Sequence, residues 1–146
     1  MRRVFAVSLV ALLCGACDEP VSGSFDVRSA SGDAFTFAPD QCVDGSEYGY
    51  WGVQLRDGGR VVDIVERDDA LYALVYSPGQ TAFEIELESC GVFEGRLKRR
   101  SINGHGTSRG HFTLECSAAD GREIVGEMRF EECGGPDDDD DDHDFR

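Results

Sequence analysis

The segment Gly-Thr-Ser-Arg-Gly at residues 106–110 contains the residue types of a nucleophilic serine site. It matches the G-x-S-x-G pattern, in which a sharp strand-to-helix turn exposes a catalytic serine, and His105 and His111 lie close to Ser108 in the chain. In this sequence, however, Ser108 leads into an alternating β-strand rather than a helix. We therefore interpret the segment as a glycine-rich hairpin turn, and we predict no catalytic residue and a protein that is not an enzyme.

Basic residues form a second candidate site on the outer face of three predicted strands. The five side chains are Lys98, Arg100, Arg109, His111 and Arg129. Like charges side by side repel each other, so this grouping indicates an anionic partner: a carboxylate or phosphate ligand, or the acidic tail of the chain itself. The alternative is a solvated face balanced by Glu84, Glu86 and Glu131. The sequence leaves both interpretations open and favours the solvated face.

The Tyr-Gly-Tyr-Trp-Gly segment that begins at Tyr48 is a candidate contact site for a sugar or a protein partner. In an alternating strand, Tyr48 and Tyr50 would point outward. Trp51, Val53 and Leu55 would then face the core. Exposed aromatic rings stack on sugars and anchor protein interfaces. A core role is the commoner use of aromatic side chains in a small β domain, so the contact site is the lesser hypothesis.

Acidic residues dominate the charge of the chain and limit the classes of partner. The formal net charge is −15 at pH 7, and consecutive aspartates run from Asp137 to Asp142. Nucleic-acid binding is not expected, because phosphate contacts need clustered Lys and Arg. The aspartate run could bind Ca²⁺ weakly, although it lacks the glycine and the closing glutamate of an EF-hand loop. We favour a disordered, solvating tail over residues 135–146, and we predict no metal site and no cofactor.

The N-terminal residues have the organisation of an export signal. A positively charged start precedes an apolar run at residues 4–13, which is too short to span a bilayer as a helix. The segment Leu-Cys-Gly-Ala-Cys at residues 13–17 resembles the lipobox of bacterial lipoproteins, with Cys14 where leucine is usual. The resemblance implies cleavage before Cys17, a diacylated Cys17 and a chain held to a membrane surface. Signal cleavage without lipid attachment is the alternative.

Cleavage at this position divides the chain into four predicted segments. They are a signal peptide at 1–16, a lipidated N-terminus and tether at 17–23, a β domain at 24–134 and the tail at 135–146. The β domain contains an even number of cysteines: Cys42, Cys90, Cys116 and Cys133. In an exported chain this favours two disulfides, and the cysteines lack the close paired spacing of zinc ligands.

Short alternating segments separated by Gly, Asp and Pro turns cover most of the β domain. Eight or nine strands are expected, and the candidate segments are residues 24–29, 34–38, 48–55, 60–66, 71–76, 82–88, 92–102, 107–116 and 122–131. No segment has a sustained helical period. The pattern predicts an all-β fold, a single antiparallel β-sandwich or barrel stapled by disulfides.

Matching of apolar faces predicts how the later strands pair. The apolar pairs are Ile85 with Leu97, Leu97 with Phe112, and Phe112 with Met128. These registers place Glu84 opposite Lys98, and His111 beside both Lys98 and Arg129.

The same registers bear on the disulfides. Cys90 and Cys116 fall at one end of the predicted sheet, whereas Cys116 and Cys133 fall at opposite ends of a hairpin, too far apart for a bond. We therefore predict Cys90–Cys116 and, by elimination, Cys42–Cys133.

The combined features indicate an exported protein of the bacterial cell envelope, anchored by lipid in the periplasm or on the outer surface. We expect a non-enzymatic binding or structural module whose ligand is a protein or a small anion. The alternative is a secreted or surface inhibitor of a cationic enzyme, since an acidic, disulfide-bonded β domain complements such a target electrostatically.

Overall fold

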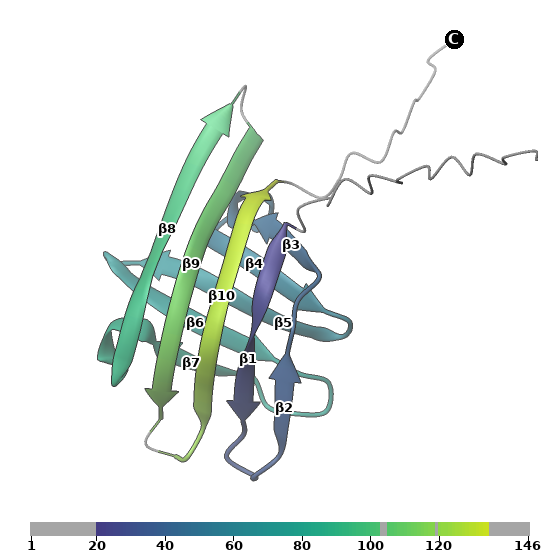
Figure 1. Cartoon of the computed structure of the whole chain (residues 1–146), viewed down its shortest axis with the longest axis vertical. Helices are drawn as coiled ribbons and strands as arrows, with labels where there is room; N and C mark the ends of the chain where they lie inside the picture. Colours follow the sequence, from purple (N-terminus) through teal and green to yellow (C-terminus); the bar gives the residue numbers. More distant parts are fainter. Residues whose placement is uncertain (1–19, 103–104, 119, 135–146) are drawn as a thin grey trace, which may run out of the picture.

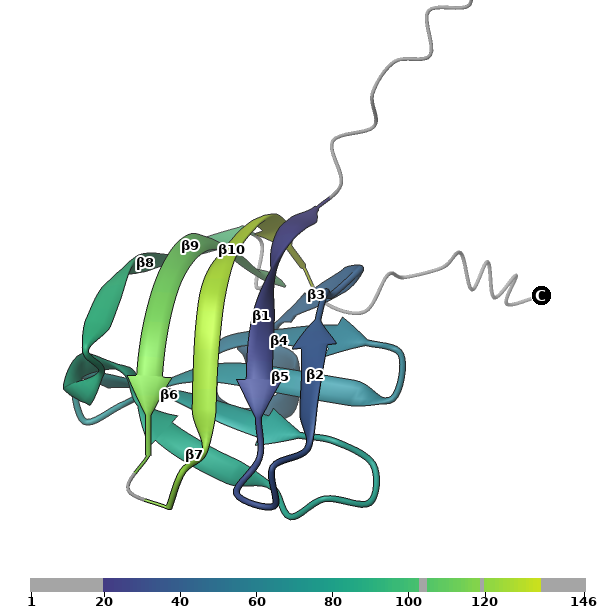
Figure 2. The same cartoon turned by 60° about the horizontal axis from the view of Figure 1, so that its bottom comes forward.

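The β domain is a sandwich of two antiparallel sheets (Figures 1 and 2). The computed structural model describes residues 20–102, 105–118 and 120–134. Sheet A has the order β2-β1-β10-β9-β8 and sheet B the order β3-β4-β5-β6-β7. The strands of sheet B run steeply across those of sheet A, and both sheets keep free edges, so the barrel alternative is wrong. Among the described residues there is no α-helix, and no helix is long and apolar enough to cross a membrane.

The bounds of the elements are as follows. Sheet A contains β1 (Val21–Arg28), β2 (Ala34–Phe37), β8 (Val92–Ile102), β9 (His105–Ser117) and β10 (Glu123–Cys133). Sheet B contains β3 (Gln41–Asp44), β4 (Trp51–Asp57), β5 (Arg60–Arg67), β6 (Ala70–Tyr76) and β7 (Phe83–Glu86). Two short 3₁₀ helices, η1 (Gly45–Tyr48) and η2 (Leu87–Ser89), follow β3 and β7.

The core lies between the sheets and follows the alternation of the sequence. Along β9, Phe112, Leu114 and Cys116 are buried while the residues between them are exposed. The same alternation appears in β1, β7 and β10, as expected for strands with one face buried and the other solvated. Four fully buried phenylalanines fill the centre: Phe25, Phe37, Phe112 and Phe130. This inward set fixes which side chains point out from sheet A.

The arrangement of the strands in the two sheets differs from the prediction in two respects. The predicted pairing of Ile85 with Leu97 is wrong, because β7 lies at the edge of sheet B and β8 at the edge of sheet A. The helix η2 and Gly91 carry the chain from one sheet to the other, so the acidic face of β7 does not lie opposite β8. The structure also adds a strand that the alternation did not predict, β3, which lies in sheet B beside β4.

Two disulfides fasten opposite ends of the sandwich, and their pairing is the predicted one. Cys90–Cys116 ties η2 to the end of β9, where the chain changes sheets. Cys42–Cys133 joins β3 of sheet B to the end of β10 in sheet A. Disulfides form and persist in oxidising compartments, which is consistent with an exported chain.

Candidate anion-binding face

Strands β8, β9 and β10 lie side by side in sheet A (Figure 1). Cationic side chains gather on the outer face of these three strands. The pairing of β9 with β8 and β10 forms a row of Arg96, His111 and Arg129. In the next row towards the tip of the β8–β9 hairpin, Lys98 lies directly opposite Arg109. All five residues are exposed, and we call them the basic face. Four of the five basic residues singled out in the sequence thus lie in these two rows.

The remaining member was missed because the predicted register of β8 and β9 is wrong by two residues. Leu97 lies opposite Gly110 rather than Phe112, so Arg96 takes the place beside His111 that the prediction gave to Lys98. Arg100 lies opposite Thr107, further towards the hairpin tip, and does not line the hollow described below. A signal for the correct register was present, because Asn-Gly at 103–104 is the dipeptide preferred in two-residue hairpin turns.

The carboxylates expected to balance the basic face are mostly elsewhere. Glu84 forms an ion pair with Arg67 on sheet B, with 2.6 Å between Nη2 and Oε1, and Glu86 lies on the same strand of that sheet. Only Glu131 of the three remains close, where it pairs with Arg129. Among the residues that the structure describes, no ion pair forms at Arg96, Lys98 or Arg109. Two of the three carboxylates that were expected to balance the basic face therefore lie on the other sheet.

Charge on the outer face of sheet A is divided rather than uniform. The row beyond Arg96 and His111 contains Glu94, Thr113 and Glu127, which places two carboxylates beside the basic face. The hydrogen bond and charge of Arg129 lower the pKa of Glu131 below its ordinary value, and Arg109 adds to the effect. Glu131 is thus ionised at neutral pH and offsets a part of the positive charge.

A shallow hollow of about 280 Å³ lies over the basic face. Gly110 and Phe130 line it together with six polar residues: Arg96, Lys98, Arg109, His111, Arg129 and Glu131. A larger hollow of about 560 Å³ opens elsewhere on sheet A, but its charged groups are paired within the site. Arg28 bonds Glu123 at 2.9 Å, and Thr36 donates to Asp26 at 2.7 Å. Of these two hollows, the smaller one is therefore the one that contains cations without an ion pair among the described residues.

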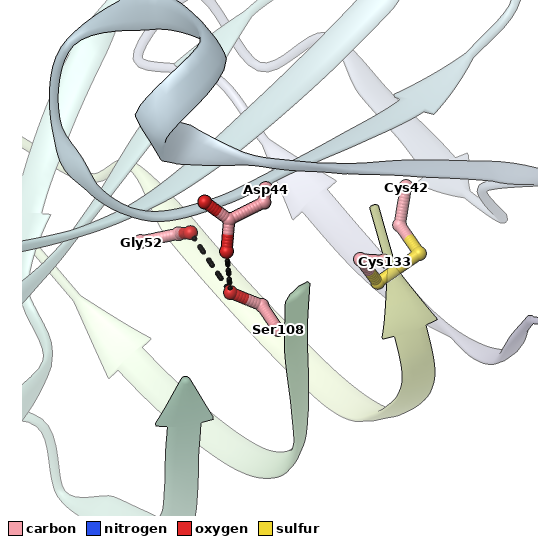
Figure 3. The surroundings of a disulfide bond; sticks show 5 residues. All are labelled: Cys42, Asp44, Gly52, Ser108 and Cys133. Atoms are coloured by element: carbon pink, nitrogen blue, oxygen red, sulfur yellow. Dashed lines mark hydrogen bonds between the residues drawn. A yellow bond between two sulfur atoms is a disulfide. The ribbon is translucent and has the colours of Figure 1, made fainter. Parts of the chain in front are cut away.

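Ser108 lies in a buried polar cluster between the sheets, at the end near the hairpin tip (Figure 3). Its side chain is 1% exposed, and its hydroxyl donates to Asp44 Oδ2 at 2.5 Å. Arg99 Nε lies 3.1 Å from each carboxylate oxygen of Asp44. Within the described part of the chain, no imidazole bonds to Ser108; His105 is exposed on β9. The motif residue therefore joins β9 to β3 and is closed to a substrate.

Asp44 connects three parts of the structure. Its backbone N–H donates to Gly134 O at 2.8 Å, and its side chain caps η1 by accepting from Ser46 N at 3.0 Å. Burial raises the pKa of Asp44, but the hydrogen bonds from Ser108, Ser46 and Arg99 together lower it below its ordinary value. Asp44 is thus a buried carboxylate that is held in its charged form by the groups around it.

The aromatic segment is only partly as predicted. Tyr48 is 47% exposed and lies under Arg56, whereas Tyr50 is half-buried and its hydroxyl donates to Asp63 at 2.9 Å. Burial, with the nearby charge of Asp63, raises the pKa of Tyr50. Trp51 is 61% exposed, so its predicted core position is wrong.

The position of Trp51 at the very start of β4 explains the difference. Val53 and Leu55 on the same strand are fully buried, as predicted, but Trp51 lies beyond the end of the core. There Arg99 covers its ring, with the guanidinium carbon 4.5 Å from the ring centroid. The ring thus packs against the guanidinium of Arg99 at the end of the sandwich rather than in the core.

Two predicted sites lie outside the described residues: Cys17 and the aspartates at Asp137 to Asp142. In residues 20–102, 105–118 and 120–134, no group of three or more His, Cys, Asp or Glu is placed to hold a metal ion. Comparison of the chain with protein families, with curated proteins and with solved structures finds no match.

Proposed function

We propose that this protein is a non-enzymatic binding module of the bacterial cell envelope, anchored by lipid at Cys17, whose basic face binds an anionic ligand. The observation that supports the binding role is the direct pairing of Lys98 with Arg109 in an acidic protein. Like charges opposite each other in a sheet destabilise it unless an anion lies between them. The cost of placing them together is therefore offset when a ligand is bound.

The chemistry of the basic face favours a ligand with several phosphate or carboxylate groups. Three of its members are arginines, whose planar guanidinium groups bind such anions through two parallel hydrogen bonds. They are spread over β8, β9 and β10, so a single small monoanion would use only part of the face. A compact polyanion would contact both rows at once.

Charge reversal of the basic face is expected to abolish this binding. In a variant with Lys98→Glu and Arg109→Glu, tripolyphosphate should bind more than tenfold more weakly, because each lost charged hydrogen bond contributes about 1.5 kcal/mol or more. Isothermal titration calorimetry at low salt measures the change. The matched control is Arg28→Glu with Arg67→Glu, which alters the net charge equally but lies away from the basic face. Equal weakening in both variants, or no binding by the native protein, contradicts the proposal.

The anchor is supported by the lipobox-like segment and by the start of the fold. Strand β1 begins at Val21, four residues after Cys17, so a lipid on Cys17 would hold the domain within roughly 15 Å of the headgroups. A binding face on sheet A would then operate close to the membrane surface.

Intact mass of the membrane-fraction protein tests the anchor. We expect a mass equal to residues 17–146 plus a diacylglyceryl group, with four cysteines that react only after reduction. A Cys17→Ser variant should lose the lipid and the membrane association, whereas Cys14→Ser should retain both, since Cys14 leaves with the signal peptide. A soluble protein of unlipidated mass overturns the anchor and leaves the binding role to be judged separately.

A further inference from the structure

We propose that the acidic segment from Asp137 to Asp142 of this chain occupies the basic face and competes there with the external anion. This inference rests on the proposed function, since it concerns the same face. It assigns to the tail the role of a built-in counterion that a ligand must displace.

Charge complementarity is the first argument for this occupant. The segment presents consecutive carboxylates, and the basic face presents Arg96, Lys98 and Arg109 without an ion pair in the described part of the chain. The spacing of side chains on a sheet lets an extended run of acids meet two neighbouring rows of cations. Outside the basic face, the exposed Arg28 and Arg67 already have carboxylate partners, whereas the exposed Arg100 has no ion pair among the described residues.

The chain length is the second argument. Gly134 follows the end of β10, and Cys133 lies opposite Ser108, the neighbour of Arg109. Arg129 is on the same strand, roughly 13 Å from Cys133 at strand spacing. Residues 135–146 can span up to about 40 Å, which leaves length for the chain to reverse direction and return over the face.

Because the tail is covalently joined to the domain, even a weak contact with the basic face is enough for the tail to occupy it. A segment joined to its site by a short linker has an effective concentration in the millimolar range, so a contact that would be negligible between separate molecules is populated. Because the groups are exposed, salt screens their attraction over about 8 Å at physiological ionic strength. An occupant of this kind yields to ligands of higher charge density and keeps weak anions away from the face.

Three forms of the mature protein test the inference by tripolyphosphate titration at low salt. They are the native chain, a chain ending at Pro136, and a full-length chain with the six aspartates changed to asparagine. The last two should bind tripolyphosphate about tenfold more tightly than the native chain. The asparagine variant keeps the length of the tail, so it separates the effect of charge from that of chain volume. Equal affinity of all three forms overturns the inference.

A structural readout identifies the place of contact. In amide NMR spectra, loss of the tail should shift signals of β8, β9 and β10 around Arg96, Lys98 and His111, and leave those of β5 unchanged. A synthetic peptide of residues 136–146 added to the shortened chain should restore the shifts, but not when Lys98→Glu and Arg109→Glu are present. Identical spectra with and without the tail contradict the inference.

The outcomes keep the two proposals distinguishable. A shortened chain that binds tripolyphosphate no better than the native chain refutes the tail contact and leaves the anion-binding face in place. A shortened chain that binds the peptide but no tripolyphosphate refutes the proposed external ligand.

Discussion

Replacement of Cys42 and Cys133 together by alanine is expected to lower the free energy of unfolding by about 4 kcal/mol, because the disulfide closes a long loop in the unfolded chain. The two residues are 91 positions apart in sequence, whereas Cys90 and Cys116 are separated by 26. The corresponding Cys90→Ala and Cys116→Ala variant should therefore lose less, about 3 kcal/mol. Urea denaturation of the oxidised proteins measures both changes.

The location of Cys42–Cys133 adds to the expected loss. It joins the short strand β3 to sheet A, and the hydrogen bonds from β3 to sheet A in the described chain are all made by Asp44. Alanine avoids the buried hydroxyl that serine would leave at Cys133, which is 1% exposed. If removal of Cys90–Cys116 lowers the free energy of unfolding more than removal of Cys42–Cys133, then neither the length of the closed loop nor the link from β3 to sheet A determines the size of the loss.

Substitution Asp44→Ala is the second change with a large expected effect. It leaves the guanidinium of Arg99, largely buried beside Trp51, without its carboxylate, and it leaves the buried hydroxyl of Ser108 without an acceptor of equal strength. Because loss of one partner from a buried ion pair is strongly destabilising, we expect Asp44→Ala to lower the free energy of unfolding by about 3–5 kcal/mol. The matched control is Glu123→Ala, which breaks the exposed ion pair with Arg28 and should cost less than about 1 kcal/mol.

The stability that Asp44 supplies is also expected to depend on pH. Its pKa in the folded state is below the ordinary value of 3.8, so the folded state favours the ionised carboxyl. The contribution of Asp44 to stability is therefore complete above the pKa that its carboxyl has in the unfolded chain. It is lost as the pH falls through the lower pKa of the same carboxyl in the folded protein. Urea denaturation at pH 7 and in acid should show the difference between native and Asp44→Asn proteins narrowing in acid. If the difference in unfolding free energy between the two proteins stays constant with pH, then the charge of Asp44 is not the source of the stability it supplies.

Much of the fold could be predicted because its strands bury one face and expose the other. Alternation located the strands of sheet A and assigned Phe112 and Met128 to the core, opposite each other as the structure has them. It also put Cys90 and Cys116 at one end of the sheet. The alternation was sufficient to assign the buried face of these strands, because a shift of one residue in the pairing would expose the whole apolar face.

The errors arose where pairing depends on more than alternation. A slip of two residues keeps the apolar face inward, so the pattern could not select the register of β8 on β9, and Arg96 was missed. Alternation also says nothing about which sheet a strand joins, so the crossover at η2 was not foreseen. Trp51 has the correct parity for the core, but the pattern does not reveal where along a strand the opposite sheet ends.

The place of Cys42–Cys133 determines how the domain would respond to mechanical tension. Both ends of the described chain leave from one end of the sandwich, where Pro20 O accepts the N–H of Glu131 at 2.8 Å. A pull applied between the two ends of the described chain would separate β1 from β10 one hydrogen bond after another. The force would then pass from residue 42 to residue 133 through the disulfide and bypass residues 43–132. The protein could lengthen by only about 75 Å, with sheet B beyond β3 and the paired strands β8 and β9 carrying no load.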